Sequence, residues 1–91
     1  IEQLGFCPPG KGGNLLNDGV TAMEGKLPVN PSGGLFGANP YVARGLIRIA
    51  EAALQVKAEA GKRQVPNVRR ALAHSVHGMG GQLHSVIILG K

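Results

Sequence analysis

The sequence predicts a layered α/β fold in which one long helix is buried between sheets. Residues 41–60 have helical periodicity and are apolar around most of the helix circumference, while two β-rich runs follow at 68–76 and 82–90. A helix that is apolar on more than one face is buried on more than one face. A chain of 91 residues buries only about 60–65% of the surface that its unfolded form exposes. We therefore expect this chain to fold as part of a larger layered structure.

The elements before the long helix are short and irregular. Residues 1–25 predict the end of a helix followed by a loop, because CPPGKGGNLLNDG contains too many prolines and glycines for a regular element. KLPVN at 26–30 predicts a brief buried strand between turn residues. PSGGLFGA at 31–38 predicts a glycine-rich connection.

The long helix has clear boundary signals. Asn39 is a good N-cap and Pro40 suits the first helical position, while Gly61 predicts the stop. Apolar residues recur at helical spacing at Val42, Leu46, Ile49, Ala53 and Val56.

The two β-rich runs predict an antiparallel hairpin, because the HGMGG segment between them can form a tight turn. Strands alternate their side chains between two faces, so Ser75 and His77 are expected on the same face. They could form a nucleophile–base pair, although no orienting acid is apparent in the sequence.

Charge and composition narrow the function classes. The net charge of +5 comes from scattered basic residues with no base-stacking aromatics among them, so we expect a solvated face or an anionic ligand, not nucleic acid. No apolar run reaches the ~18 residues of a membrane span. The single cysteine, Cys7, fits a reducing, cytoplasmic compartment. A chain that begins with Ile1 is expected to be a processed or excised piece.

Two motifs that invite a ligand assignment do not support one. His74, His77, His84 and Cys7 have spacings unlike those of zinc sites, so no metal site is predicted. PGKGG at residues 9–13 lacks the frame of a phosphate-binding P-loop.

Three segments in order resemble the last quarter of a thiolase: LPVNPSGGL, then EAGKRQVPN, then a β-run that ends in a glycine-rich turn. The resemblance is greatest to the branch of sterol-carrier-protein-type thiolases, archaeal acetyl-CoA acetyltransferases and lipid-transfer-type steroid side-chain aldolases. LGFC at residues 4–7 is also similar to this branch. The resemblance implies the C-terminal portion of a five-layer αβαβα fold: a strand, a buried central helix and an antiparallel strand pair. Residues 1–91 would form the C-terminal segment of the C-terminal half, and this chain would lack the N-terminal half with its acyl-cysteine.

The sequence departs from the family pattern at both catalytic motifs of this quarter. The Gly-His-Pro position holds Ala-Asn-Pro at 38–40, and the Cys-x-Gly position holds Ser-Val-His at 75–77. The resemblance therefore implies retro-aldol cleavage of a β-hydroxyacyl-CoA, with a lipid or steroid side chain, in preference to thiolysis. An acetyl-CoA acyltransferase and a non-catalytic thiolase-like subunit stay open as alternatives.

The resemblance also implies site residues and partners. Tyr41 is expected either to act in catalysis or to fill the volume of the missing histidine. The catalytic candidates are Tyr41, His77 and Ser75, and the substrate-binding candidates are Asn39, Gly34, Gly78 and Gly80. No cofactor is expected beyond coenzyme A as part of the acyl-CoA substrate. Expected partners are the remainder of the thiolase-fold protein, a second copy in a homodimer, and a zinc-ribbon/OB-fold protein. The piece alone is expected to be inactive.

Overall fold

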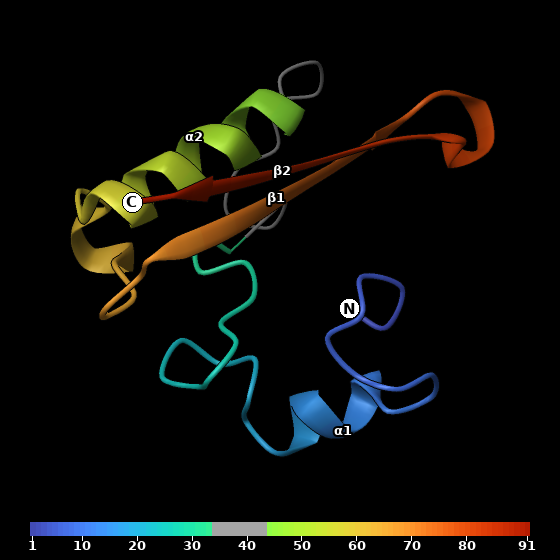
Figure 1. The fold of residues 1–91 in the computed structure, drawn as a ribbon, viewed down its shortest axis with the longest axis horizontal. Helices are drawn as coiled ribbons and strands as arrows, with labels where there is room; N and C mark the ends of the chain where they lie inside the picture. The colour runs from blue at the N-terminus through green and yellow to red at the C-terminus, as the bar shows by residue number, and fades with distance from the viewer. Residues whose placement is uncertain (34–43) are drawn as a thin grey trace. The chain divides into compact units, whose positions relative to one another are not determined.

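The computed structural model of the protein describes residues 1–33 and 44–91 (Figure 1). They form two compact units, Ile1–Pro31 and Ser32–Lys91. The predicted start of the long helix, and the glycine-rich connection from residue 34 onward, lie outside the described residues. The elements in chain order are α1 (Gly12–Asn17), α2 (Arg44–Lys57), the 3-10 turn η2 (Gly61–Arg63), β1 (Arg70–His77), the 3-10 turn η3 (Met79–Gly81) and β2 (Leu83–Gly90).

The first unit contains a short helix where the sequence predicts only loop. The chain begins with a turn, not a helix end, and α1 covers six residues within the glycine-rich stretch. The Glu2 carboxylate explains this difference, because its two oxygens accept the backbone N–H groups of Gly10 at 2.8 Å and Gly12 at 2.9 Å. These bonds lower the pKa of Glu2 from its ordinary value. One side chain thus accepts the N–H of the first residue of α1 and that of Gly10 in the preceding turn.

The prediction of a strand at residues 26–30 is wrong. This segment is a loop, in which the N–H groups of Leu27 and Val29 donate to the carbonyls of Val20 and Thr21 at 3.0 and 3.1 Å. Asn30 has φ 51°, a left-handed conformation that ends extended backbone. A β-leaning run becomes a strand only with a ladder partner, and none pairs with it among the described residues.

The long helix is confirmed over α2, but it ends before the predicted glycine. Ala58 takes a left-handed φ of 60° directly after Lys57. Its N–H donates to the Gln55 carbonyl at 3.2 Å, and the Glu59 N–H donates to the Leu54 carbonyl at 2.9 Å. These two bonds form a Schellman motif. The alanine is therefore held in a conformation that usually selects glycine.

One side of α2 packs against the hairpin, mainly against β1. Ala52 and Val56 of α2 and Ala73 of β1 are buried there. Leu46 and Ile47 of α2 remain 69% and 41% exposed. Cover on a second side of the helix stays a prediction.

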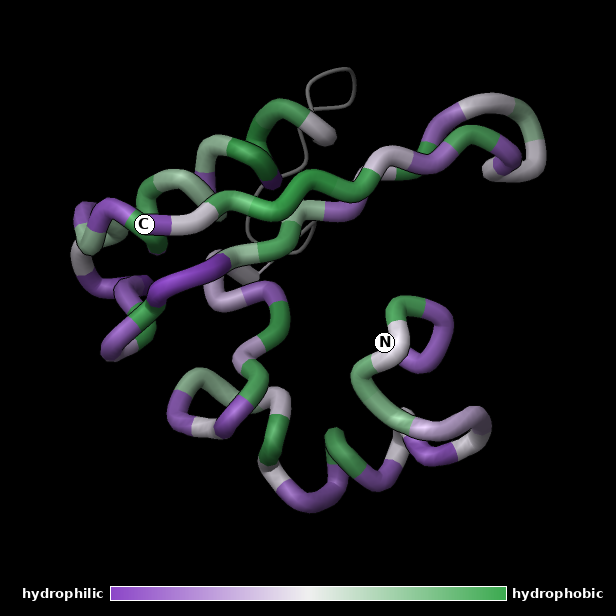
Figure 2. The backbone as a smooth tube through the Cα atoms, in the orientation of Figure 1, coloured by the Kyte–Doolittle hydropathy of each residue, from purple (hydrophilic) through white to green (hydrophobic). Residues whose placement is uncertain are grey.

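The antiparallel hairpin is confirmed, with a register from Arg70 opposite Gly90 to His77 opposite Leu83. Figure 2 shows a continuous hydrophobic stretch along β2. The face of the hairpin that carries Val76, Val86 and Ile88 is exposed. The α/β arrangement agrees with the predicted fold class, apart from the missing first strand. None of the helices in the described residues is long and apolar enough to cross a membrane.

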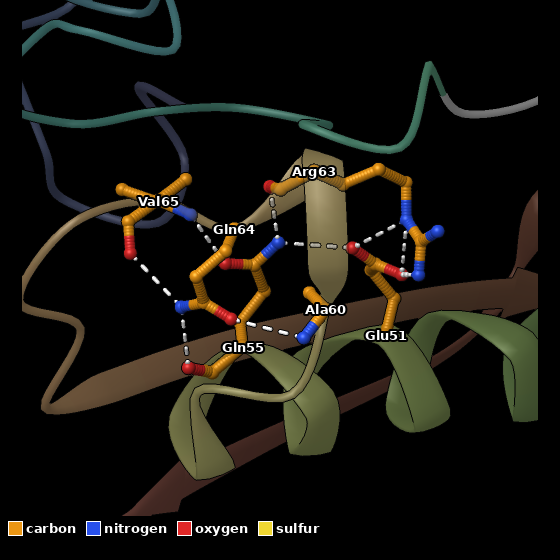
Figure 3. A network of polar contacts seen from close by, with 6 residues as sticks. All are labelled: Glu51, Gln55, Ala60, Arg63, Gln64 and Val65. Carbon is orange, nitrogen blue, oxygen red and sulfur yellow. Dashed lines mark hydrogen bonds and ion pairs between the residues drawn. The ribbon is translucent and has the colours of Figure 1, made fainter.

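A polar network fixes the connection between α2 and β1 (Figure 3). The Gln55 side chain, 4% exposed, donates to Glu51 Oε1 at 3.0 Å and to the Arg63 carbonyl at 2.8 Å, and it accepts the Val65 N–H at 2.9 Å. Gln64 bonds to the backbone of Gln55, Ala60 and Val65, which returns the chain toward the helix.

Arg63 completes the network by pairing with Glu51 through two nitrogens at 3.0–3.3 Å. Partial burial raises the pKa of Glu51, but the bonds from Arg63 and Gln55 and the Arg63 charge outweigh it, so the pKa lies below its ordinary value. The EAGKRQV segment, residues 59–65, thus forms a corner that Arg63 and Gln64 fasten to Glu51 and Gln55 of α2.

Candidate functional site

Ser75 lies on the face of the hairpin that packs against α2. A Cβ atom added at Gly45 would lie 2.6 Å from Ser75 Oγ and 3.3 Å from Ser75 Cβ, so the serine side chain sits directly against the helix backbone. Ser75 is partly buried and stands opposite Ser85 of β2. A side chain at position 45 would force the Ser75 hydroxyl to turn away and the Ser75 Cβ to shift slightly.

Arg48 lies one turn further along α2 and also reaches β1. Its Nη1 donates to the His74 carbonyl at 3.0 Å, and the side chain is partly buried. The sequence alone does not predict a role for Arg48, because a charged side chain on a helix usually belongs to a solvated face. The signal was the spacing of three and four residues from Gly45 and Ala52, which places Arg48 on the buried stripe.

His77 ends β1 and is exposed. Strand alternation places it on the same face as Ser75, as predicted. These two described side chains form no hydrogen bond with each other, so the structure gives no nucleophile–base pair. Their direction toward an active site stays a prediction.

The turn after His77 contains both predicted substrate-binding glycines of this region. Gly78 and Gly80 have φ values of 92° and 75°, a conformation that favours glycine. The Gln82 side chain lies against this turn, 3.1 Å from where a Cβ of Gly78 would be. The other candidates, Tyr41, Asn39 and Gly34, lie outside the described residues.

His74 and His84 form a pair on the opposite face of the hairpin from Ser75. His74 Nε2 and His84 Nδ1 are 2.9 Å apart, and the ring planes differ by only 6°. With centroids 5.2 Å apart, the rings meet edge to edge, as a hydrogen bond between their nitrogens requires. His77 is on the other face. Within the described residues no three His, Cys, Asp or Glu side chains gather at metal-binding distance.

A hollow lies at the far end of the hairpin, lined by Asn67, Val68, Arg69 and Lys91. Arg69, which lines the hollow, precedes Ser75 by six positions and His77 by eight along the extended strand. The hollow therefore does not include the described candidate residues. The described candidates lie instead at the end of β1 and in the turn that follows it. Ser75 contacts the start of α2 in this region.

The whole chain is similar in sequence to a known protein family. The family model described as "Thiolase C-terminal domain-like" matches residues 1–91. The chain is 44% identical over 82 residues to an acetyl-CoA acetyltransferase of Methanothermobacter thermautotrophicus, a match that covers 89% of this chain and 21% of that relative. It is 49% identical over 81 residues to sterol carrier protein 2 of Oryctolagus cuniculus, covering 88% of this chain and 15% of the relative.

A third relative is the benzoylsuccinyl-CoA thiolase subunit BbsB of Thauera aromatica, 36% identical over 80 residues, 87% of this chain and 21% of the relative. The chain thus spans about a fifth or less of the curated relatives that it matches. The family model nevertheless matches all 91 residues of the chain, and the helix and antiparallel hairpin agree with it. The chain belongs to the thiolase C-terminal domain-like family.

Proposed function

We propose that residues 1–91 are the C-terminal segment of a complete enzyme that cleaves a β-hydroxyacyl-CoA by a retro-aldol reaction. The observation that carries the proposal is Ser75 Oγ against Gly45. In the family pattern, an acid/base cysteine is expected at this position. A thiol has an ordinary pKa near 8.5 and exchanges protons readily. A serine hydroxyl only donates and accepts hydrogen bonds at neutral pH, so thiolysis is disfavoured.

The reaction needs one base and donors to the thioester oxygen. A base removes the proton of the β-hydroxyl, the β-carbon becomes a carbonyl as the Cα–Cβ bond breaks, and the electron pair passes to the thioester as an enolate. Protonation at the α-carbon then releases a shorter acyl-CoA and an aldehyde or ketone. We assign the base to His77, because an imidazole is the side chain that most often serves as a general acid or base in proton transfer.

The donors in this proposal come from the end of β1, the turn after it and the start of α2. The Ser75 hydroxyl and the backbone N–H groups near Gly78 and Gly80 would stabilise the enolate oxygen. Tyr41 would donate a hydrogen bond from its phenol hydroxyl. Asn39 and Gly34 would shape the acyl-CoA site.

The test uses the complete protein with a β-hydroxyacyl-CoA, and mass spectrometry to follow the carbonyl product and the shortened acyl-CoA. His77→Ala should lower the cleavage rate by about 10²-fold or more, the usual contribution of a general base. His84→Ala is the matched control, because it removes a histidine from the opposite face, and it should leave the rate within about threefold. Equal losses in both variants would remove His77 from the proposed mechanism.

An acyltransferase is the second candidate, because two of the relatives carry the names acetyl-CoA acetyltransferase and benzoylsuccinyl-CoA thiolase subunit. A parallel reaction with a β-ketoacyl-CoA and free CoA distinguishes it. Thiolysis without retro-aldol cleavage would establish this alternative. Absence of both reactions in a protein that still binds its partners would favour a non-catalytic subunit.

We also propose obligate partners for the complete protein. The exposed Leu46 and Ile47 of α2 support cover by the remainder of the thiolase-like fold. A homodimer, and a zinc-ribbon/OB-fold protein that helps to hold the acyl chain, are further expectations of the family resemblance. Analytical ultracentrifugation of the co-purified complex tests them, and a lone monomer would contradict both.

A further inference from the structure

Gly45, Arg48 and Ala52 form a stripe on α2 at positions i, i+3 and i+7, which places them on one face of the helix. Ala52 is 7% exposed, and Gly45 touches Ser75. Arg48 is thus a cation between two small residues at a helix–strand contact. It forms no ion pair with a carboxylate within residues 1–33 and 44–91. Its bond to the His74 carbonyl is therefore the interaction that explains its place in the described structure.

This bond acts on the backbone next to Ser75. The His74 carbonyl, the Ser75 nitrogen and the Ser75 Cα belong to one planar peptide unit. A donor that fixes the carbonyl therefore also restrains the position of the Ser75 backbone. A bond from a charged donor is stronger than a neutral one. Arg48 therefore restrains Ser75 from the backbone side, while the contact with Gly45 limits it from the side-chain side.

We propose that Arg48 is a positioning residue, which holds the Ser75 hydroxyl against Gly45 through the His74 carbonyl. The inference rests on the proposed function, in which this hydroxyl donates to the thioester oxygen. A misplacement of about 1 Å in such a group lowers a rate by about 10²-fold. Arg48 itself need not touch the substrate.

The test compares kinetics in the complete protein. Arg48→Ala should lower kcat by about 10- to 100-fold with KM within about threefold, since the lost interaction acts in the transition state. Arg48→Lys keeps a charged donor and should recover most of the rate. Arg70→Ala is the matched control, because it removes an exposed arginine from β1, the strand that carries His74 and Ser75. It should leave kcat unchanged.

A double-mutant cycle separates positioning from a general structural effect. If Arg48 acts through Ser75, Arg48→Ala should cause no further loss of kcat in a Ser75→Ala background. An equal fold loss in both backgrounds would overturn the proposal. So would an Arg48→Ala enzyme with wild-type kcat.

Two measurements keep the inference testable if activity or folding fails. If the wild-type protein cleaves no β-hydroxyacyl-CoA, only the proposed function fails. A crystal structure of Arg48→Ala then tests the positioning role. Ser75 Oγ should move away from Gly45, and an unmoved Oγ overturns the positioning proposal. Should Arg48→Ala not fold, Arg48→Met keeps an unbranched side chain of similar length and removes the donors to the His74 carbonyl. Its loss of kcat should appear in wild type and vanish in a Ser75→Gly background. A loss that persists there overturns the proposal.

Discussion

Replacing Gln55 by alanine tests how much the corner between α2 and β1 depends on one buried amide. The substitution removes three hydrogen bonds, to Glu51, to the Arg63 carbonyl and from the Val65 N–H. A typical intramolecular hydrogen bond contributes a net ~1 kcal/mol. We therefore expect local destabilisation of about 2–4 kcal/mol, the upper end applying if backbone groups stay unpaired.

Hydrogen exchange of the Val65 amide measures this directly, because that N–H donates to Gln55 Oε1. Since each 1.4 kcal/mol is a factor of ten, exchange in the complete protein should accelerate by about 30- to 700-fold. Gln55→Glu preserves the shape but loses the donors and adds a charge beside Glu51, so it should be at least as harmful. The exposed Gln3 provides the matched control, Gln3→Ala, with no effect on Val65. Exchange within threefold of wild type in Gln55→Ala would refute the reasoning.

Three further predictions follow from the structure and the sequence. The pKa of Glu2 is lowered below 4.5 mainly by the Gly10 and Gly12 N–H groups, so the stabilisation from these bonds is present above that pH and is lost as the pH falls through the lowered pKa. The chemical shifts of the two amides should titrate with a midpoint below 4.5 in wild type and stay flat in Glu2→Gln. A midpoint at or above 4.5 would contradict this. Tyr41→Phe should lower C–C cleavage more than about threefold, ~0.7 kcal/mol of transition-state stabilisation, whereas a smaller loss would favour a packing role. Residues 1–91 expressed alone should show no cooperative unfolding transition, and a monomer that melts cooperatively would disprove the need for outside cover.

Local patterns predicted the elements that depend on local interactions. The hairpin was predictable because its strands are joined by a short glycine-rich turn, and α2 because its apolar residues recur at helical spacing. The strand at 26–30 was not, because strand formation depends on a partner that the local sequence does not specify. The end of α2 was misplaced because Schellman bonds hold Ala58 in a conformation expected of Gly61.

The candidate site was predicted in part. Period-two alternation placed Ser75 and His77 on one face of β1, and the structure agrees. The contact of Ser75 with Gly45 joins residues 30 positions apart in sequence, so no local pattern indicates it. Arg48 was missed because a charged residue on a helix is usually solvated, whereas here its guanidinium reaches a strand carbonyl.

The corner network also affects the order in which this chain folds. Its bonds join residues separated by 1 to 12 positions. Loops of about ten residues close in roughly 10–100 ns, and short loops lose little entropy on closure. The end of α2 and the segment leading to β1 can therefore meet before any contact with distant parts of the protein forms. Since low contact order favours fast folding, this corner would offer a preformed edge onto which later strands assemble.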